Sequence, residues 1–264
     1  MNVAVLDESV AVLVNSAFAD GIFHMELNRP EAGNAANKAF AEQLLSAVRR
    51  ANEESGARVL LISAAGRNFM AGGELAGLRD NPAGSLEVVN TVAAVIAGIA
   101  EFRGPVVCAV QGFAAGGGLG LALSAEILIN EEGARFTVGS PAIGLAPDAG
   151  TTWQLARWVG MRKATEMSLL CTTVDAPSAL ACGLVTELAA KGGLMELAWS
   201  RARQLASAAR LATEQTKRLL KLSETNTLGE QLQAEVNAFA LCSQSPDLRE
   251  GVDAMLGKRK ASFS

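Results

Sequence analysis

The sequence predicts an α/β fold with a mainly parallel sheet, followed by a helical C-terminal region. As far as residue 150, short apolar, β-branched runs alternate with segments that repeat apolar residues at helical spacing. Beyond residue 151 the patterns are all helical. Alternation of this kind is typical of parallel strands that are connected by helices.

The N-terminal elements follow from these patterns. Residues 10–14 and 22–27 predict a pair of strands, and residues 59–63 (VLLIS) predict a buried parallel strand. Asn34 is the expected N-cap of the helix that lies between these strands. The apolar side chains of that helix recur every fourth residue, at Ala36, Phe40, Leu44 and Val48.

The middle and C-terminal elements are predicted in the same way. Residues 87–102 predict a helix, residues 105–110 a strand, Leu119 the start of a short helix, and residues 127–129 a strand. Further helices are expected at 151–158, 162–170, 177–183, 194–208, 213–223, 227–242 and 247–256, the last capped by Ser245. We place a boundary near residue 200, between a core (1–200) and a helical region (201–264).

Composition limits the classes of partner. Half of the 264 residues are hydrophobic and only 19% are charged, whereas about a quarter is usual for a soluble domain. We therefore expect apolar surface that is buried between subunits. The net charge is −4, and Lys and Arg cluster only in the last few residues, so nucleic acid is not an expected partner.

The sequence predicts a reduced, cytoplasmic protein without a metal site. The single histidine, His24, lies in a strand pattern. The cysteines are widely spaced and form no CxxC motif: Cys108, Cys171, Cys182 and Cys242. Residues 1–14 lack the basic start of a secretory signal. Residues 105–129 contain Gln111, Glu126 and several glycines, which favours strand, turn, helix and strand over a membrane span.

Residues 114–120 (AAGGGLG) follow an apolar strand and carry three adjacent glycines. Glycines cost conformational entropy on folding, so backbone is expected to approach another group closely there. Neither a Walker loop nor a dinucleotide fingerprint fits their spacing. Two interpretations remain: a close strand–helix crossing, or a helix N-terminus that binds an anion, including one formed during a reaction.

Four segments in order resemble one family. They are residues 27–35 (LNRPEAGNA), 69–75 (FMAGGEL), 111–118 (QGFAAGGG) and 251–260 (GVDAMLGKRK). Together they resemble the crotonase superfamily, that is, the enoyl-CoA hydratase/isomerase family. The resemblance covers nearly the whole chain. It implies a core of repeated ββα units arranged as a spiral, and a C-terminal helical region that packs subunits into homotrimers, often paired as hexamers.

The resemblance also implies an acyl-CoA thioester substrate, with no cofactor apart from the CoA that the substrate carries. The N–H groups of Gly73 and Gly117 would form an oxyanion hole, in which each donor contributes on the order of 3–4 kcal/mol. The substrate-binding residues are expected to be Ala71, Leu75, Met70, Phe113, Gly116 and Trp153, with Leu78 as a further wall. Lys258, Arg259 and Lys260 would either contact the CoA phosphates or form a solvated basic tail.

The acid and base groups are expected to decide the reaction. Hydratases of this family use two glutamates, and we match their positions to Gly120 and Ala142, so two-glutamate hydration is disfavoured. Asp148 instead resembles the Pro-Asp-x-Gly segment of isomerases in the family, which use the aspartate as acid and base. The alternative role for Asp148 is to cap a helix. Glu74 is expected to be a helix-terminal charge.

We therefore predict an acyl-CoA isomerase in which Asp148 moves a proton from C2 to C4 of a 3-enoyl-CoA, or isomerises a ring-derived substrate. An apolar pocket would raise the pKa of Asp148 toward the range such a shuttle needs. One alternative is another enolate reaction, such as hydration, hydrolysis or C–C cleavage, with Glu74 as a second group. The other is a catalytically silent acyl-CoA-binding subunit.

Overall fold

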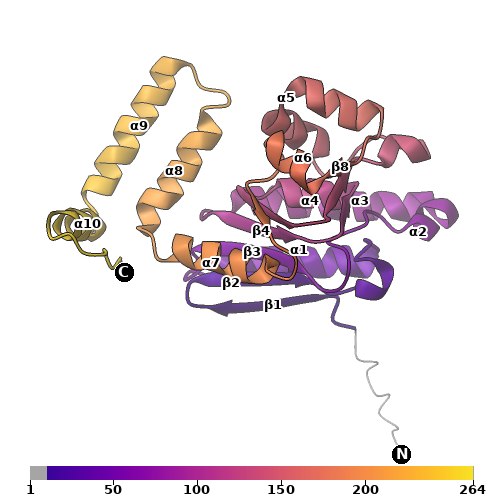
Figure 1. The fold of residues 1–264 in the computed structure, drawn as a ribbon, viewed down its shortest axis with the longest axis horizontal. Coiled ribbons are helices and arrows are strands. Elements are labelled where there is room, and N and C mark those ends of the chain that lie inside the picture. Colours follow the sequence, from indigo (N-terminus) through magenta and orange to yellow (C-terminus); the bar gives the residue numbers. More distant parts are fainter. Residues whose placement is uncertain (1–10, 264) are drawn as a thin grey trace, which may run out of the picture.

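The structure is a computed structural model that describes residues 11–263. Within them, a six-stranded sheet has the order β1-β2-β3-β4-β6-β9 (Figure 1). β1 and β2 are antiparallel, and the other neighbouring pairs are parallel. The bounds are β1 Val14–Ala19, β2 Ile22–Leu27, β3 Val59–Ala64, β4 Val106–Val110, β6 Ile127–Glu131 and β9 Glu187–Ala189. The predicted α/β fold with a mainly parallel sheet is confirmed.

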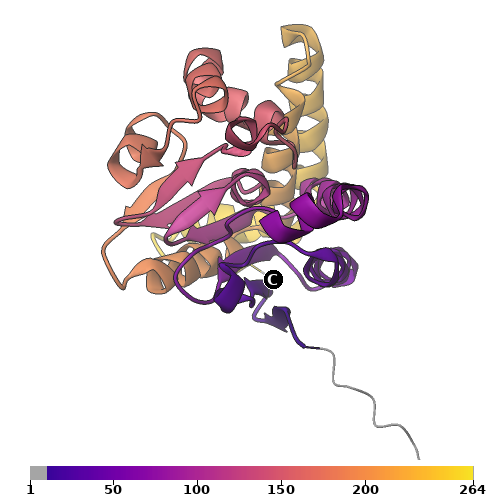
Figure 2. The ribbon, with the colours of Figure 1, turned by 90° about the vertical axis from the view of Figure 1, so that its right-hand side faces the viewer.

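The sheet is covered by helices on both faces. In β3, Leu60 and Ile62 belong to the core shared with α1 (Lys38–Glu53) and α3 (Pro82–Glu101), which lie side by side in Figure 2. Val59 and Leu61 point to the opposite face, where α7 (Leu194–Ala206) packs. Because successive strand residues face opposite sides, a strand buried on both faces is apolar throughout. This explains the uninterrupted apolar run of β3.

The first strand lies later in the chain than predicted. Residue 10, the start of the predicted strand, lies outside the described residues, and β1 begins at Val14. The reason is the turn that follows it: Asp20 and Gly21 have φ angles of 51° and 75°. Two residues with positive φ make the tight turn of a hairpin, so the strand must run directly into Asp20.

The predicted cap at Asn34 is also wrong. The N-cap of α1 is Asn37, whose Oδ1 accepts a hydrogen bond from the N–H of Phe40 at 2.9 Å. Asn34 is fully buried with φ 56°, and its side chain holds three backbone groups. Its Oδ1 accepts from Arg29 N–H at 2.7 Å, and its Nδ2 donates to the carbonyls of residues 65 and 68 at 3.0 and 2.9 Å. Asn34 therefore braces the loop before α1.

A second, three-stranded sheet in the order β5-β7-β8 lies beside the main one, and the sequence patterns did not predict it. Its strands are β5 Phe113–Ala115, β7 Arg135–Thr137 and β8 Val174–Asp175. Strands of two or three residues are too short to show an alternating pattern. Between the strands lie the short helices α2 Leu75–Asp80, α4 Gly117–Leu123, η2 Ser140–Ile143 and α6 Ala176–Ala181, with η1 Pro30–Ala32 near the chain start.

The helices predicted at 151–158 and 162–170 form one element, α5 (Thr151–Leu169). Gly160, with φ 75°, interrupts its helical geometry, which is the break that the sequence predicted. α3 begins five residues before the predicted residue 87, because Asn81 caps it and Pro82 occupies its first turn. Within the described residues α3 is long and apolar enough to cross a membrane. Its buried side chains, Val92, Val95 and Ile99, belong to the core cluster.

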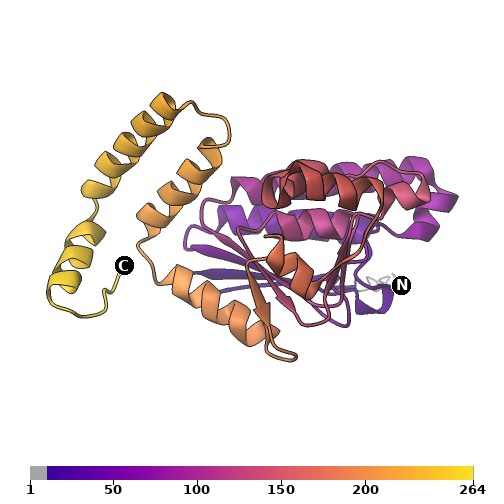
Figure 3. The same cartoon turned by 45° about the horizontal axis from the view of Figure 1, so that its top comes forward.

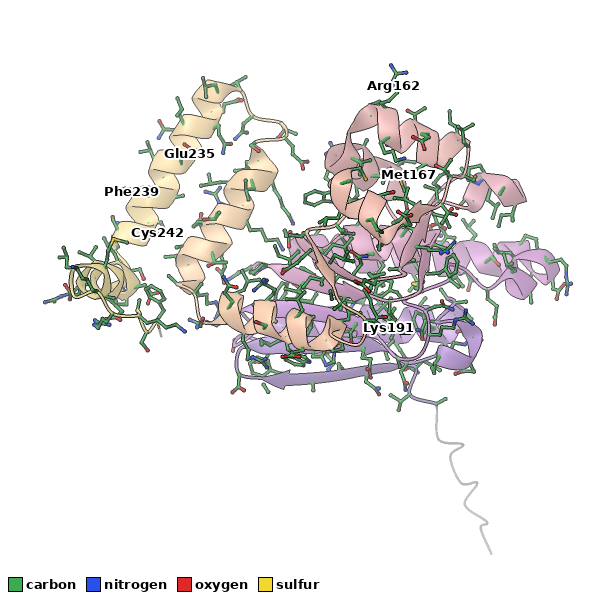
Figure 4. The ribbon with its side chains drawn as sticks, in the orientation of Figure 1. Arg162, Met167, Lys191, Glu235, Phe239 and Cys242 are labelled. Carbon is green, nitrogen blue, oxygen red and sulfur yellow. The ribbon has the colours of Figure 1, made fainter. Side chains whose placement is uncertain are left out.

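The last three helices project from the core as an arm (Figure 3), which we define as α8 Arg210–Leu222, α9 Leu228–Ser243 and α10 Pro246–Leu256. Their bounds agree closely with the predicted helices, and Ser245 caps α10 as predicted. A capping box at Thr227 and Glu230 begins α9. A cavity of about 570 Å³ opens between the arm helices, and Phe239 and Cys242 of α9 line it (Figure 4).

Candidate active site

Residues 116–118, which we call the glycine turn, connect β5 to α4. Each of the three glycines meets a different structural requirement. Gly116 has φ 52°, which favours a residue without Cβ. Gly118 packs on Met70, whose carbonyl oxygen would collide with any Cβ at this position. Gly117 is the first residue of α4. The close strand–helix approach and the open helix N-terminus are thus both present, and the two predicted interpretations are not exclusive.

A second loop brings Gly73 next to this turn. Ala36 N–H donates to Gly72 O at 2.7 Å, and Glu74 N–H donates to Ala36 O at 3.0 Å, so a short bridge fixes Gly73. A Cβ built on Gly72 would lie 3.9 Å from the Cα of Gly116. Among the described residues, the N–H groups of Gly73 and Gly117 have no acceptor. Two free donors on adjacent loops are what an oxyanion requires.

Asp148 completes the arrangement from a third segment, the loop before α5. Its Oδ1 is buried and has no hydrogen-bond partner. A Cβ built on Gly117 would lie 3.4 Å from this oxygen, so the carboxyl group faces the glycine turn. Burial raises the pKa of the Asp148 carboxyl above its ordinary value.

The helix-capping role considered for Asp148 is wrong. The N-cap residue of α5 is Gly150, in the left-handed region with φ 67°, and no side chain caps the helix. Asp148 contributes only its backbone carbonyl, which accepts a hydrogen bond from Thr151 N–H at 2.9 Å. The side chain is therefore free to act in the cavity that it faces.

These segments enclose a cavity of about 490 Å³. Of the predicted site residues, it is lined by Ala71, Gly73, Leu75, Gly116, Gly117, Asp148 and the predicted wall residue Leu78. The opposite wall comes from α2 and α3, with Asn81, Ser85, Val88 and Val89 among its residues. These four residues were not among the predicted site residues, because α2 was not predicted and α3 was expected to begin only at residue 87.

Met70, Phe113 and Trp153 do not line this cavity. Met70 is 1% exposed, and its backbone is held in a ladder by Phe113 O and Ala115 N–H. Phe113 points away from the buried side of β5 and is exposed. The ring of Trp153 lies under the Arg157 guanidinium, 3.6 Å from ring centroid to Cζ. A substrate contact by these three side chains stays a prediction.

Neither position matched to a hydratase glutamate, Gly120 or Ala142, lines the cavity. A Cβ on Gly120 would lie 2.5 Å from the carbonyl oxygen of Ala149 and 2.8 Å from Thr151 Oγ1, so the turn before α5 fills that space. Ala142, the predicted match of the other glutamate, is exposed and does not line the cavity. Ser140 and Ile143 of this segment do line it, and neither was predicted as a site residue.

The charged residues that were considered for the site lie in two separate places. Glu74 is the N-cap residue of α2 and lines the cavity, and its Oε1 lies 2.7 Å from the guanidinium of Arg29. Lys258 and Lys260 are exposed at the end of the arm, and none of residues 258–260 lines the 490 Å³ cavity. Arg259 pairs with Glu250 at 2.6 Å. A contact of this segment with CoA phosphates stays a prediction.

His24 is a packed strand residue, as predicted. Its Nε2 lies 2.8 Å from Ser63 Oγ, and its ring meets Trp199 edge-on at 5.1 Å between centroids. Burial lowers the pKa of His24, so the neutral form is favoured. Within residues 11–263, no group of three or more His, Cys, Asp or Glu side chains is placed to hold a metal ion.

Comparison with known proteins agrees with this geometry. A protein of Escherichia coli named 1,2-epoxyphenylacetyl-CoA isomerase is 34% identical over 249 residues, which cover 92% of this chain and 95% of that protein. Another E. coli protein, named 2,3-dehydroadipyl-CoA hydratase, is 31% identical over 90% of this chain and 93% of its own length. Relatives thus include both an isomerase and a hydratase.

Solved structures give the same result. A Mycobacterium abscessus protein, assigned provisionally as an enoyl-CoA hydratase/isomerase, superposes with a TM-score of 0.92 and 36% identity, covering 95% of this chain and 99% of its own. An enoyl-CoA hydratase from a Polaromonas species has a TM-score of 0.88 and 29% identity over 95% and 99%. The predicted crotonase fold is confirmed. Residues 17–264 match the enoyl-CoA hydratase/isomerase family itself, and the chain belongs to this family, within the crotonase superfamily.

Proposed function

We propose that the protein is an acyl-CoA isomerase that uses Asp148 as both base and acid. The observation that carries this proposal is the position of one carboxyl oxygen. Asp148 Oδ1 is buried, has no partner and faces Gly117, whose N–H is one of two free donors in the same cavity. A base beside a pair of oxyanion donors fits proton abstraction next to a thioester carbonyl.

The proposed reaction proceeds in two proton transfers. The thioester oxygen accepts hydrogen bonds from the N–H groups of Gly73 and Gly117. The Asp148 carboxylate takes a proton from C2 of a 3-enoyl-CoA, and the electron pair that is left spreads over C2, C4 and the thioester oxygen as a dienolate. The protonated carboxyl then returns the proton to C4, which gives the 2-enoyl-CoA. A ring-derived acyl group would isomerise through the same enolate.

Hydration by two glutamates is the less favoured reaction. Gly120 has no room for a side chain, and the cavity face of the 140–143 segment carries the hydroxyl of Ser140 instead of a carboxylate. Asp148 is then the carboxyl group that faces the glycine turn. The E. coli isomerase among the relatives supports this choice.

A hydratase-like or other enolate-based lyase or hydrolase is the second candidate. Two observations favour it: several relatives are named as hydratases, and Glu74 lines the same cavity. Against it, the Glu74 carboxylate is already paired with Arg29. A silent binding subunit is weakened as an alternative, because the Asp148 side chain faces the cavity and does not cap a helix.

The proposal includes a cytoplasmic homotrimer, or a hexamer made of two trimers, without a cofactor apart from substrate CoA. Large apolar side chains on the arm support assembly, since exposed apolar patches of this kind mark interfaces. They include Leu228, Leu232, Val236, Phe239, Met255 and Leu256, which are 53–82% exposed in the single chain.

Product analysis separates the two enzymatic candidates. We expect 3-hexenoyl-CoA to be converted to a product of unchanged mass that absorbs as a conjugated 2-enoyl thioester. Hydration of 2-hexenoyl-CoA, visible as a mass increase of one water, should be slower by orders of magnitude. Rapid hydration with no double-bond shift would overturn the isomerase assignment and favour the hydratase-like alternative.

A further inference from the structure

We propose that Gln154 is a positioning residue of the candidate active site, whose side-chain amide connects the helix of one oxyanion donor to the loop of Asp148. The connection would fix the distance between the Gly117 N–H and the Asp148 carboxyl. This inference rests on the proposed function, in which these two groups act on the same substrate. Gln154 itself does not line the cavity, so its effect on the reaction would pass through its neighbours.

The amide of Gln154 bridges two backbone segments. Its Nε2 donates to Gly120 O of α4 at 3.0 Å and to Ala149 O at 3.4 Å. The first distance is that of an ordinary hydrogen bond, and the second is longer and weaker. Because the amide nitrogen carries two hydrogens, it can serve both carbonyls at once. The residue is only 7% exposed, so these contacts are shielded from water.

Each end of this bridge lies next to a group that acts in the proposed reaction. Gly120 follows the donor Gly117 by three residues in α4, and its N–H donates to Gly116 O at 3.2 Å. At the other end, Ala149 directly follows Asp148. One helical turn on one side and one peptide unit on the other thus connect Gln154 to the donor and to the base. A shift of the amide would therefore change the distance between them.

The loop of Asp148 has a backbone that needs such support. Ala149 and Gly150 both lie in the left-handed region, with φ 51° and 67°. This conformation is unfavourable for a residue with a Cβ and persists where the surroundings hold it. Ala149 is 4% exposed, and a Cβ built on Gly120 would lie 2.5 Å from its carbonyl oxygen, so the loop packs directly on α4. The amide of Gln154 holds this same carbonyl.

A second contact between α5 and α4 supplies a matched control. Trp158 lies four residues after Gln154, and its Nε1 donates to Leu123 O at 3.1 Å. Both side chains attach α5 to α4, whereas the contact of Gln154 also reaches the loop of Asp148. A purely structural role would be shared by Gln154 and Trp158, so a loss of rate confined to Gln154 variants would show positioning.

The test measures turnover separately from binding. Gln154→Met removes the two N–H donors and keeps a side chain of similar length. Isomerisation of 3-hexenoyl-CoA by the full chain gives kcat and KM, and calorimetry with butanoyl-CoA gives Kd and the number of working sites. We expect kcat per site to fall about 10- to 100-fold, since a base misplaced by about 1 Å can cost this much, while KM and Kd change less than about threefold. Trp158→Phe should lower Tm but keep kcat.

Gln154→Asn is a second variant, whose amide is one methylene too short to reach both carbonyls. It should fold and show a loss of the same kind, whether or not Gln154→Met folds. An unchanged kcat in either folded variant, an equal loss in Trp158→Phe, or failure of both Gln154 variants to fold would overturn the positioning role and leave the isomerase proposal standing. A wild type that binds butanoyl-CoA but does not isomerise 3-hexenoyl-CoA would overturn the proposed function and this inference with it.

Discussion

Asp148 is the residue on which the proposed function depends most. Its carboxyl is half-buried, and Oδ1 has no hydrogen-bond partner among the described residues. Burial therefore raises its pKa. An unpaired buried acid costs stability, and such a cost is common at active sites, which is consistent with the proposed role.

This arrangement predicts a pH-dependent gain of stability in Asp148→Asn. The native state holds the proton more tightly than the unfolded chain, so the wild type loses stability as the pH rises through the raised pKa. The variant lacks this loss. We expect its Tm to exceed that of the wild type at pH 7, and the difference to shrink as the pH falls toward the ordinary pKa of aspartate. A variant that is less stable at pH 7 would contradict the account.

The second prediction concerns Gly120. The turn before α5 fills the space that a side chain at this position would need. Gly120→Ala should lower the free energy of unfolding by about 1–3 kcal/mol through overpacking, measured by urea denaturation. It should also slow isomerisation, since the displaced turn carries Asp148. Gly229→Ala is the control: a Cβ there meets no atom within 4 Å, and alanine is the better helix former.

At the level of single residues, the sequence predicted part of the candidate site. The triple glycine and Asp148 were recognisable through their resemblance to family segments, since the residue patterns alone also allowed a structural role for each. Ser140 was not recognisable, since only the folded turn shows that residue 140 and not residue 142 faces the cavity. Met70 was expected in the lining, but its burial beneath Gly118 depends on a contact between distant segments.

At the level of secondary structure, contacts made by α8 attach the arm to the core. Lys217 Nζ donates to Gly104 O at 2.7 Å and lies 3.1 Å from Glu126 Oε1. Lys221 Nζ donates to Ala100 O at 2.9 Å. Two lysines one turn apart thus bind the end of α3 and the loop before β4. Burial lowers the pKa of Lys217 to about 8.

Lys217→Met should therefore destabilise the protein by about 1–3 kcal/mol at pH 7, because Gly104 O loses a buried donor. The native state of the wild type releases the proton near pH 8, whereas the unfolded chain keeps it until about pH 10.5, so the wild type gains stability between these values. The cost of the substitution should thus be larger at pH 9.5 than at pH 7 in urea denaturation. A smaller loss of unfolding free energy at pH 9.5 than at pH 7 would contradict this role of Lys217. Lys221→Met, at a more exposed side chain, should cost less.

Helices of the arm were predicted to within three residues, because caps and apolar periodicity are local signals. Several strands were not. β5, β7, β8 and β9 have only two or three residues each and form where distant segments pair. The hairpin between β1 and β2 was placed wrongly for another reason, since the turn signal at Asp20 and Gly21 was overlooked.

For the whole molecule, the proposed assembly explains the low charge content and the exposed side chains of the arm. Leu232 and Phe239 of α9 are 53% and 75% exposed in the single chain. Figure 4 shows Phe239 on the arm, far from the core sheet. A trimer would bury such side chains between subunits, which a solitary chain leaves in water.

The double variant Leu232→Glu, Phe239→Glu should therefore dissociate the assembly, because buried unpaired charges are costly. Light scattering during gel filtration should give three or six times 27.3 kDa for the wild type and about 27.3 kDa for the variant. Gln233→Glu is the control on the same helix and should leave the mass unchanged. A wild type of 27.3 kDa would contradict the proposed assembly.

The central claim is that Asp148 carries the proton, and solvent deuterium exchange tests it most directly. Wild type and Asp148→Asn are incubated with 3-hexenoyl-CoA in D₂O, and label at C2 and C4 is followed by mass spectrometry and NMR. We predict isomerisation by the wild type, with label at these carbons to the extent that the Asp148 proton exchanges with solvent before it is returned, and a loss of isomerisation of at least 100-fold in the variant, as for removal of a general base. Equal exchange by both proteins would place the base elsewhere and contradict the account.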